Sequence, residues 1–133
     1  MERFLVVGVG ISSLVLLVAV ACTQTRTITQ DGLQVASLIQ LISEPERCDG
    51  VEVQVLGFID IEQHAIFLMP EDAEHDITKN ALWLHLAETS QHLLEEHSQS
   101  FYGKVEGVFE ADNLGPGNVY SGTLRDITKI NRM

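Results

Sequence analysis

The chain has 133 residues, of which 19 are acidic and 8 are basic, and its formal net charge is −11. This length suits one domain of ordinary size, with a single hydrophobic core. So acidic a surface repels phosphate backbones, and we expect no nucleic-acid partner. The sequence contains no Gly-x-Ser-x-Gly elbow, no His-Glu-x-x-His and no P-loop pattern, so it predicts no catalytic residues, no cofactor and no enzyme.

Residues 1–21 are typical of an export segment, because an uncharged run from Phe4 to Ala21 follows Arg3. The end of this run, Val18-Ala19-Val20-Ala21-Cys22, resembles the bacterial lipobox, in which small residues precede a cysteine that receives lipid. The resemblance implies lipidation of Cys22. The run is also close to the minimum length of a membrane-spanning helix, so an uncleaved anchor is the alternative. Both interpretations place the domain outside the cytoplasmic membrane and tether it there.

The residues that follow predict a tether and then the folded domain. Residues 22–34 are polar without a sustained period, and we assign them as the tether, with the domain over 35–133. Removing residues 1–21 takes away Glu2 and Arg3, so the net charge stays at −11. A lipidated Cys22 would leave Cys48 without an intramolecular partner, so we expect no disulfide and a buried, apolar Cys48.

The first folded element should be a short helix. Ser37 followed by Gln40 matches a capping box and predicts a helix over 38–44. Pro45 can start a further turn, which should end at Asp49-Gly50.

From residue 51 the period changes to two, which predicts a long strand over 51–62 that bends at Gly57. A second strand over 65–69 should pair with it as a hairpin, and Pro70 should stop that strand. We interpret Glu71 to Lys79 as an acidic connection. The later predicted elements are a strand over 81–87, a helix capped by Thr89 or Ser90 that ends near His97, a strand over 102–110 and a last strand over 119–130.

This order predicts a mainly β protein with a five-stranded OB-fold-like barrel, an N-terminal helix and a helix between strands three and four. The chain resembles a group of uncharacterised bacterial OB-fold proteins, similar in fold to anticodon-binding-like OB domains. The resemblance covers about 35–131 and implies no activity. It rests on Ser37-Leu38, Glu44-Pro45-Glu46, Asp49-Gly50, Gly57-Phe58, Ala81-Leu82-Trp83-Leu84, Tyr102-Gly103-Lys104-Val105-Glu106-Gly107 and Ser121-Gly122-Thr123-Leu124.

Four side chains are candidates for ligand binding, because the alternation of the strands places them on the outer side of the barrel: Phe58, Phe67, Trp83 and His85. OB-folds bind ligands on that side, and aromatic rings there can stack on bases, sugars or peptide side chains. The alternative is that the N-terminal helix or a loop covers Trp83, which would make a second small core.

Other polar clusters carry less information. The run Glu71-Asp72-Ala73-Glu74-His75-Asp76, even with His64 nearby, matches no calcium or zinc signature, and we interpret it as a solvated loop with no metal. His92 and His97 are five residues apart, a poor spacing for one helical face, and we expect both at the surface.

The sequence therefore predicts a cell-envelope lipoprotein whose OB-fold binds a protein or a small ligand. The alternative function is a metal-dependent or hydrolytic envelope enzyme.

Overall fold

The computed structural model describes residues 33–133. The predicted export segment, Cys22 and all of the predicted tether before Leu33 lie outside the described residues. Within 33–133, no helix has both the length and the hydropathy that crossing a bilayer requires.

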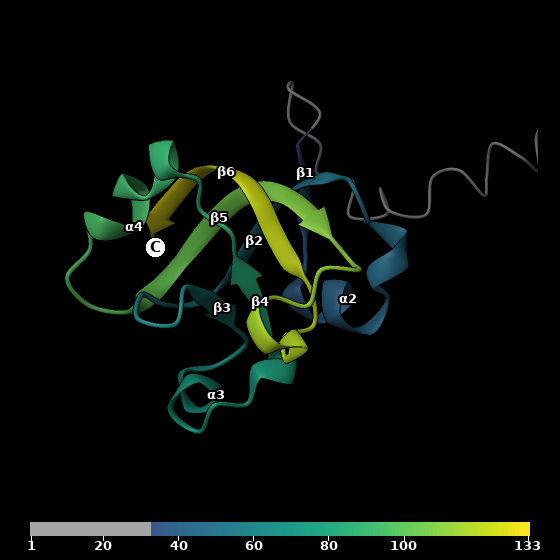
Figure 1. Ribbon diagram of the computed structural model, residues 1–133, viewed down its shortest axis with the longest axis horizontal. Coiled ribbons are helices and arrows are strands. Elements are labelled where there is room, and N and C mark those ends of the chain that lie inside the picture. The colour runs from purple at the N-terminus through teal and green to yellow at the C-terminus, as the bar shows by residue number, and fades with distance from the viewer. Residues whose placement is uncertain (1–32) are drawn as a thin grey trace, which may run out of the picture.

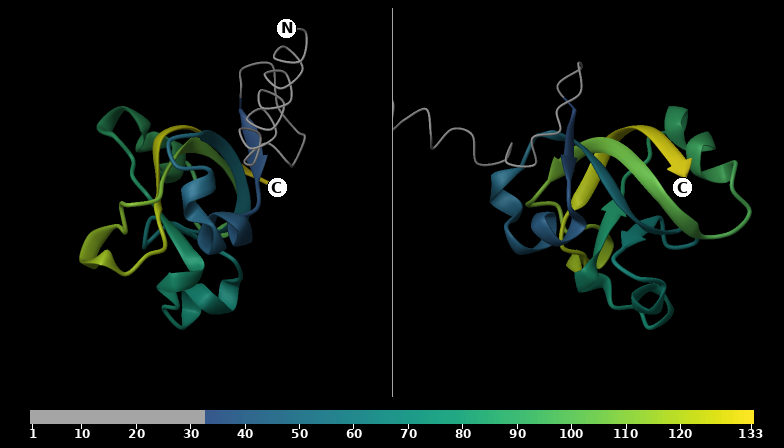
Figure 2. Two further views of the ribbon diagram at one scale, coloured as in Figure 1. Left: turned by 90° about the vertical axis from the view of Figure 1, so that its right-hand side faces the viewer. Right: turned by 180° about the vertical axis from the view of Figure 1, so that it is seen from behind.

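Five strands form a closed barrel, as predicted: β2 (Glu52–Asp60), β3 (Ala65–Phe67), β4 (Ala81–Leu84), β5 (Phe101–Glu110) and β6 (Thr123–Arg132). The order around the barrel is β2, β3, β4, β6, β5, and β5 pairs with β2 to close it. The β4–β6 pairing is parallel and the other four are antiparallel. Figures 1 and 2 show these strands curving around one core, with α2, α3 and α4 at three separate places around it.

The inward side chains of the strands make the main core. Along β2, Val53, Val55 and Ile59 are fully buried, which confirms the predicted alternation, while Val51 and Ile61 are partly buried at its ends. Other members of this core include Leu41, Ile66, Leu82, Leu84, Phe101, Val105, Phe109 and Leu124.

Helix α2 (Leu38–Ser43) begins at the predicted residue. The Ser37 hydroxyl accepts a hydrogen bond from the Gln40 backbone N–H at 3.4 Å, which satisfies one donor of the first turn. Leu38 and Leu41 are its buried residues. A short 3-10 helix, η2 (Pro45–Arg47), follows where Pro45 was predicted to start a turn.

The structure adds a strand that the sequence did not predict, and its first residue, Gln34, falls in the predicted tether. Strand β1 (Gln34–Ala36) lies parallel to β2 and pairs with Val53 to Val55. It uses the edge of β2 that β3 leaves free, since β3 pairs only with Phe58 to Asp60.

The connection between β3 and β4 is also more ordered than predicted. Strand β3 already ends at Phe67, before the predicted stop at Pro70. Pro70 instead begins helix α3 (Pro70–Glu74), because its missing N–H costs nothing at the first helical position. Ala73 is the buried residue of α3, and a 3-10 helix, η3 (Thr78–Asn80), leads into β4.

The helix between strands three and four is present but short. A 3-10 helix, η4 (Glu88–Ser90), precedes α4 (His92–Glu95), and no side chain caps either helix. The predicted cap at Thr89 or Ser90 is therefore wrong, since both residues lie inside η4. Leu94 is the buried residue of α4, and Glu95 and Glu96 are exposed. A last 3-10 helix, η5 (Pro116–Asn118), lies between β5 and β6.

Cys48 is 1% exposed, as predicted, but it is disulfide-bonded. The expectation that it has no partner is therefore wrong. That expectation rested on Cys22 being occupied by lipid, and Cys22 is the other cysteine of the chain.

Candidate functional site: a pocket at the end of the barrel

The structure places the predicted aromatic residues on the outer side of the barrel but does not leave all of them accessible. Phe58 pairs with Phe67 across β2 and β3, and Trp83 pairs with Ala65 across β3 and β4. Phe67 is fully buried. It belongs to a second hydrophobic cluster with Ala65, Ala73, Ala81 and Tyr120, against which Phe58 and Trp83 pack.

The cover over these rings comes from α3 and from the segment between β5 and β6. Ala73 of α3 and Tyr120 complete the second cluster. The backbone of Gly115 lies so close to Trp83 that a Cβ atom there would be 2.9 Å from Trp83 Cβ. An accessible Phe67 is therefore ruled out in this structure, and the alternative of a second small core agrees with it.

The two remaining candidates differ in exposure. His85 is exposed, and its ring centroid lies 5.3 Å from that of Trp83, which is partly buried. Phe58 is partly buried and meets the exposed Tyr102 edge-on at 5.5 Å. None of the four predicted residues lines the pocket described next.

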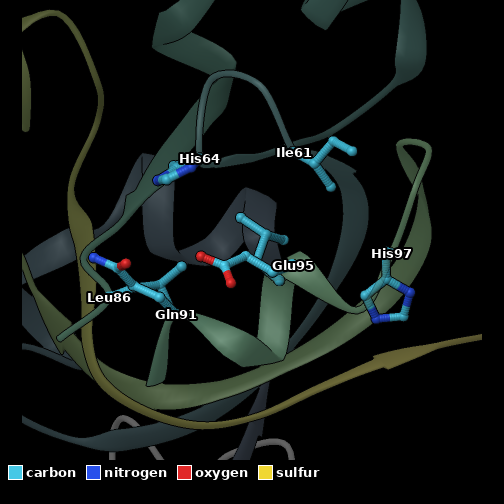
Figure 3. Close-up of a pocket in the computed structure, with 7 residues that line it drawn as sticks. Ile61, His64, Leu86, Gln91, Glu95 and His97 are labelled. Atoms are coloured by element: carbon cyan, nitrogen blue, oxygen red, sulfur yellow. The ribbon is translucent and has the colours of Figure 1, made fainter. Parts of the chain in front are cut away.

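A pocket of about 270 Å³ lies at the end of the barrel beside α4, and we call it the barrel-end pocket (Figure 3). Its walls come from the end of β2, the turn before β3, the segment after β4, and α4. The lining residues are Ile61, His64, Leu86, Gln91, Leu94, Glu95 and His97.

The turn after β2 positions His64. The Asp60 carboxylate accepts hydrogen bonds from the backbone N–H groups of Glu62 at 2.9 Å and Gln63 at 3.1 Å. His64 then adopts a φ of +54°, and its carbonyl accepts a hydrogen bond from the Leu84 N–H at 2.8 Å. These bonds fix the backbone that carries the imidazole.

Helix α4 supplies the opposite wall. The Gln91 carbonyl accepts hydrogen bonds from the N–H groups of Leu94 and Glu95, both at 3.1 Å, and Leu94 is 3% exposed. With Leu94 turned into the core, the next side chain, Glu95, reaches the pocket. Figure 3 shows its carboxylate in the middle of the pocket, with His64 and Gln91 to one side and His97 to the other.

His97 is held by stacking. Its ring centroid lies 4.1 Å from that of Phe101, and the Arg132 guanidinium lies 4.8 Å over the same phenyl ring. Its Nε2 atom is buried and has no hydrogen-bond partner within the described part of the chain. A buried polar atom without a partner is costly.

The pocket thus joins an apolar floor of Ile61, Leu86 and Leu94 to four polar side chains. The sequence predicted His97 at the surface and singled out His64 only beside the acidic run at 71–76, because an isolated segment shows only its own periodicity. Glu95 is exposed and still lines the pocket. Residues 61–64 and 91–97 come together where the end of the barrel closes. Neither segment has a sequence pattern that predicts this contact.

Residues 33–133 contain no grouping of three or more histidine, cysteine, aspartate and glutamate side chains that could hold a metal ion. Comparisons with protein-family models, with curated proteins and with solved structures find no match to this chain.

Proposed function

We propose that this chain is an extracytoplasmic module, tethered to the membrane, that binds a small ligand in the barrel-end pocket. The observation that carries the proposal is the composition of that pocket. Small-molecule sites combine a mostly apolar wall with a few polar groups that fix orientation. Here Ile61, Leu86 and Leu94 supply the wall, and two segments far apart in the sequence supply the polar groups.

Two features support a location outside the cytoplasm. Residues 1–21 have the composition of an export segment. The disulfide of Cys48 is of the kind that persists in oxidising compartments and is rare in the cytosol.

The tether is lipid on Cys22 or an uncleaved N-terminal anchor. The two alternatives differ in what they allow the Cys22 sulfur to bond. One sulfur atom cannot hold both a thioether-linked lipid and a disulfide. Lipid on Cys22 therefore requires a different partner for Cys48, such as a second chain, whereas an uncleaved anchor is compatible with a disulfide between the two cysteines of this chain.

Metabolic labelling with a fatty acid, followed by intact-mass measurement of the membrane-purified protein, decides between them. Incorporated label, together with release of the Cys22→Ala variant from the membrane, supports lipid. No label and unchanged membrane association of that variant support the anchor. Recovery of the wild-type protein in the soluble fraction would contradict both forms of the tether.

Ligand binding in the pocket is tested by titrating the full chain with a library of small fragments. Two-dimensional NMR then follows the backbone signals of residues 33–133. We expect binding fragments to shift the backbone signals of Ile61, His64 and Gln91. Leu86→Trp should fill the pocket and abolish these shifts, while Ala87→Trp, at the exposed neighbouring position, should not. Fragments that bind both variants equally, or a library without hits, would contradict this site.

A further inference from the structure

We propose that the barrel-end pocket takes a small organic cation, a protonated amine on a short apolar chain. This inference rests on the proposed function and names its ligand class. It is carried by the position of one carboxylate, by the hydrogen-bonding groups around that carboxylate, and by the size of the apolar floor.

Glu95 provides the negative charge. Its carboxylate projects into the pocket from α4 (Figure 3). The ion pairs formed among residues 33–133 involve Arg47 and Arg125, and their acidic partners are Glu44, Glu110 and Asp126. Arg132, which stacks on Phe101 behind His97, does not line the pocket. The charge of Glu95 is thus available to a ligand.

The groups beside Glu95 suit an N–H donor. A neutral imidazole has one nitrogen that accepts a hydrogen bond, and a glutamine side chain has an acceptor oxygen. His64 and Gln91 lie to one side of the carboxylate in Figure 3. The His97 ring lies on the other side, with its nitrogen atoms turned away from the carboxylate. An ammonium group carries up to three donors and no acceptor, so it can serve several of these groups at once.

The apolar floor determines the size and polarity of the part of the ligand that carries the amine. Ile61, Leu86 and Leu94 line a pocket of about 270 Å³, slightly below the usual range for drug-sized ligands. A chain of a few carbons fits such a space. An anion is disfavoured, because residues 44–112 contain 16 acidic residues against Arg47, Lys79 and Lys104. The same field raises the local concentration of cations and the rate at which they associate.

The test compares four ligands of similar size in the NMR titration: butylammonium, butyltrimethylammonium, butanol and butyrate. We expect butylammonium to bind at least about tenfold more tightly than butanol, a difference of about 1.4 kcal/mol. It should also bind more tightly than butyltrimethylammonium, which has no N–H to donate. Butyrate should bind most weakly. Glu95→Gln should remove the advantage of butylammonium over butanol and leave butanol binding unchanged, whereas Glu96→Gln, at the adjacent exposed position, should change neither.

Gln91→Glu offers a gain-of-binding check, because a second carboxylate in the pocket should tighten the binding of both cations. Equal binding of butanol and butylammonium, or full cation affinity in Glu95→Gln, would overturn the cation class and leave the proposed function standing. If none of the four ligands shifts the pocket signals while unrelated fragments do, the class is wrong as well. If no compound binds at all, both proposals fail.

Discussion

Gly57 lies directly against the carbonyl oxygen of Phe67, so that a Cβ atom at position 57 would be 2.7 Å from that oxygen. It would also be 2.8 Å from Cγ1 of Ile66. This close approach occurs where β2 changes neighbours, from β1 at Val55 to β3 at Phe58. Glycine at this position lets β2 bend and keeps the hairpin tight.

Gly57→Ala should therefore destabilise the domain, because backbone as well as side chain would have to move. We expect a loss of about 1–3 kcal/mol in the free energy of unfolding, measured by urea denaturation. Glu52→Ala, on the outward face of the same strand, is the control and should change stability by less than about 0.5 kcal/mol. Equal stability of Gly57→Ala and the wild type would contradict the packing described.

Phe67→Ala should behave as a core mutation and not as a loss of ligand contact. The ring is fully buried in the second cluster, so we expect its removal to cost about 3–5 kcal/mol. His85→Ala, at an exposed position, should leave the thermal midpoint nearly unchanged. Calorimetry of the two variants checks this, and a stable Phe67→Ala protein would mean that the ring is accessible after all.

Thr123 anchors the segment between β5 and β6. Its hydroxyl is fully buried and donates a hydrogen bond to the Asn113 carbonyl at 2.8 Å. Thr123→Val keeps the shape but removes the donor, and we expect it to cost about 1–3 kcal/mol in urea denaturation. Thr128→Val, at an exposed position of the same strand, is the matched control, and an equal effect of both substitutions would argue against the bond.

Tyr120 should make stability depend on alkaline pH. Burial, and then the nearby carboxylates of Asp60 and Asp76, raise the pKa of Tyr120 above 10.0. The unfolded protein therefore ionises this phenol first, and the stabilisation present below pH 10 should be lost as pH rises toward the folded-state pKa. Denaturation from pH 9 to 11 should show a steeper decline for the wild type than for Tyr120→Phe. Parallel curves would be inconsistent with the raised pKa.

Much of the barrel could be predicted from local patterns. The alternation of Val53, Val55 and Ile59, the break at Gly57 and the Ser37 cap are visible in short windows of sequence, and each appears in the structure. Strand β1 could not be predicted in this way, because three residues show no period and their partner is a free edge of β2. Helix α3 was not predicted, because it is short and mostly acidic and has only one buried side chain, Ala73, which gives no helical pattern of apolar residues.

The candidate site was harder to predict, because it depends on which surfaces the chain covers with itself. Alternation correctly placed Phe67 on the outer side of the barrel, yet it carried no information about Ala73 and Tyr120, which cover the ring. Glu95 is exposed, but nothing in its own segment shows that it lines the same pocket as His64. Its helix is exposed in the sequence pattern, and only the packing of Leu94 against the barrel end turns the carboxylate toward His64.

The pairing of β2 with β5 also has a consequence for how the domain folds. The barrel closes through residues far apart in the chain, with Glu52 opposite Val108 and Ile59 opposite Phe101. Contacts between residues so far apart in the chain form slowly, because the entropy of the intervening loop is lost before the contacts stabilise the barrel. Until β6 joins β4 to β5, both open edges can pair with other chains. We therefore expect folding in a single cooperative step, with aggregation as the competing reaction whenever barrel closure is delayed.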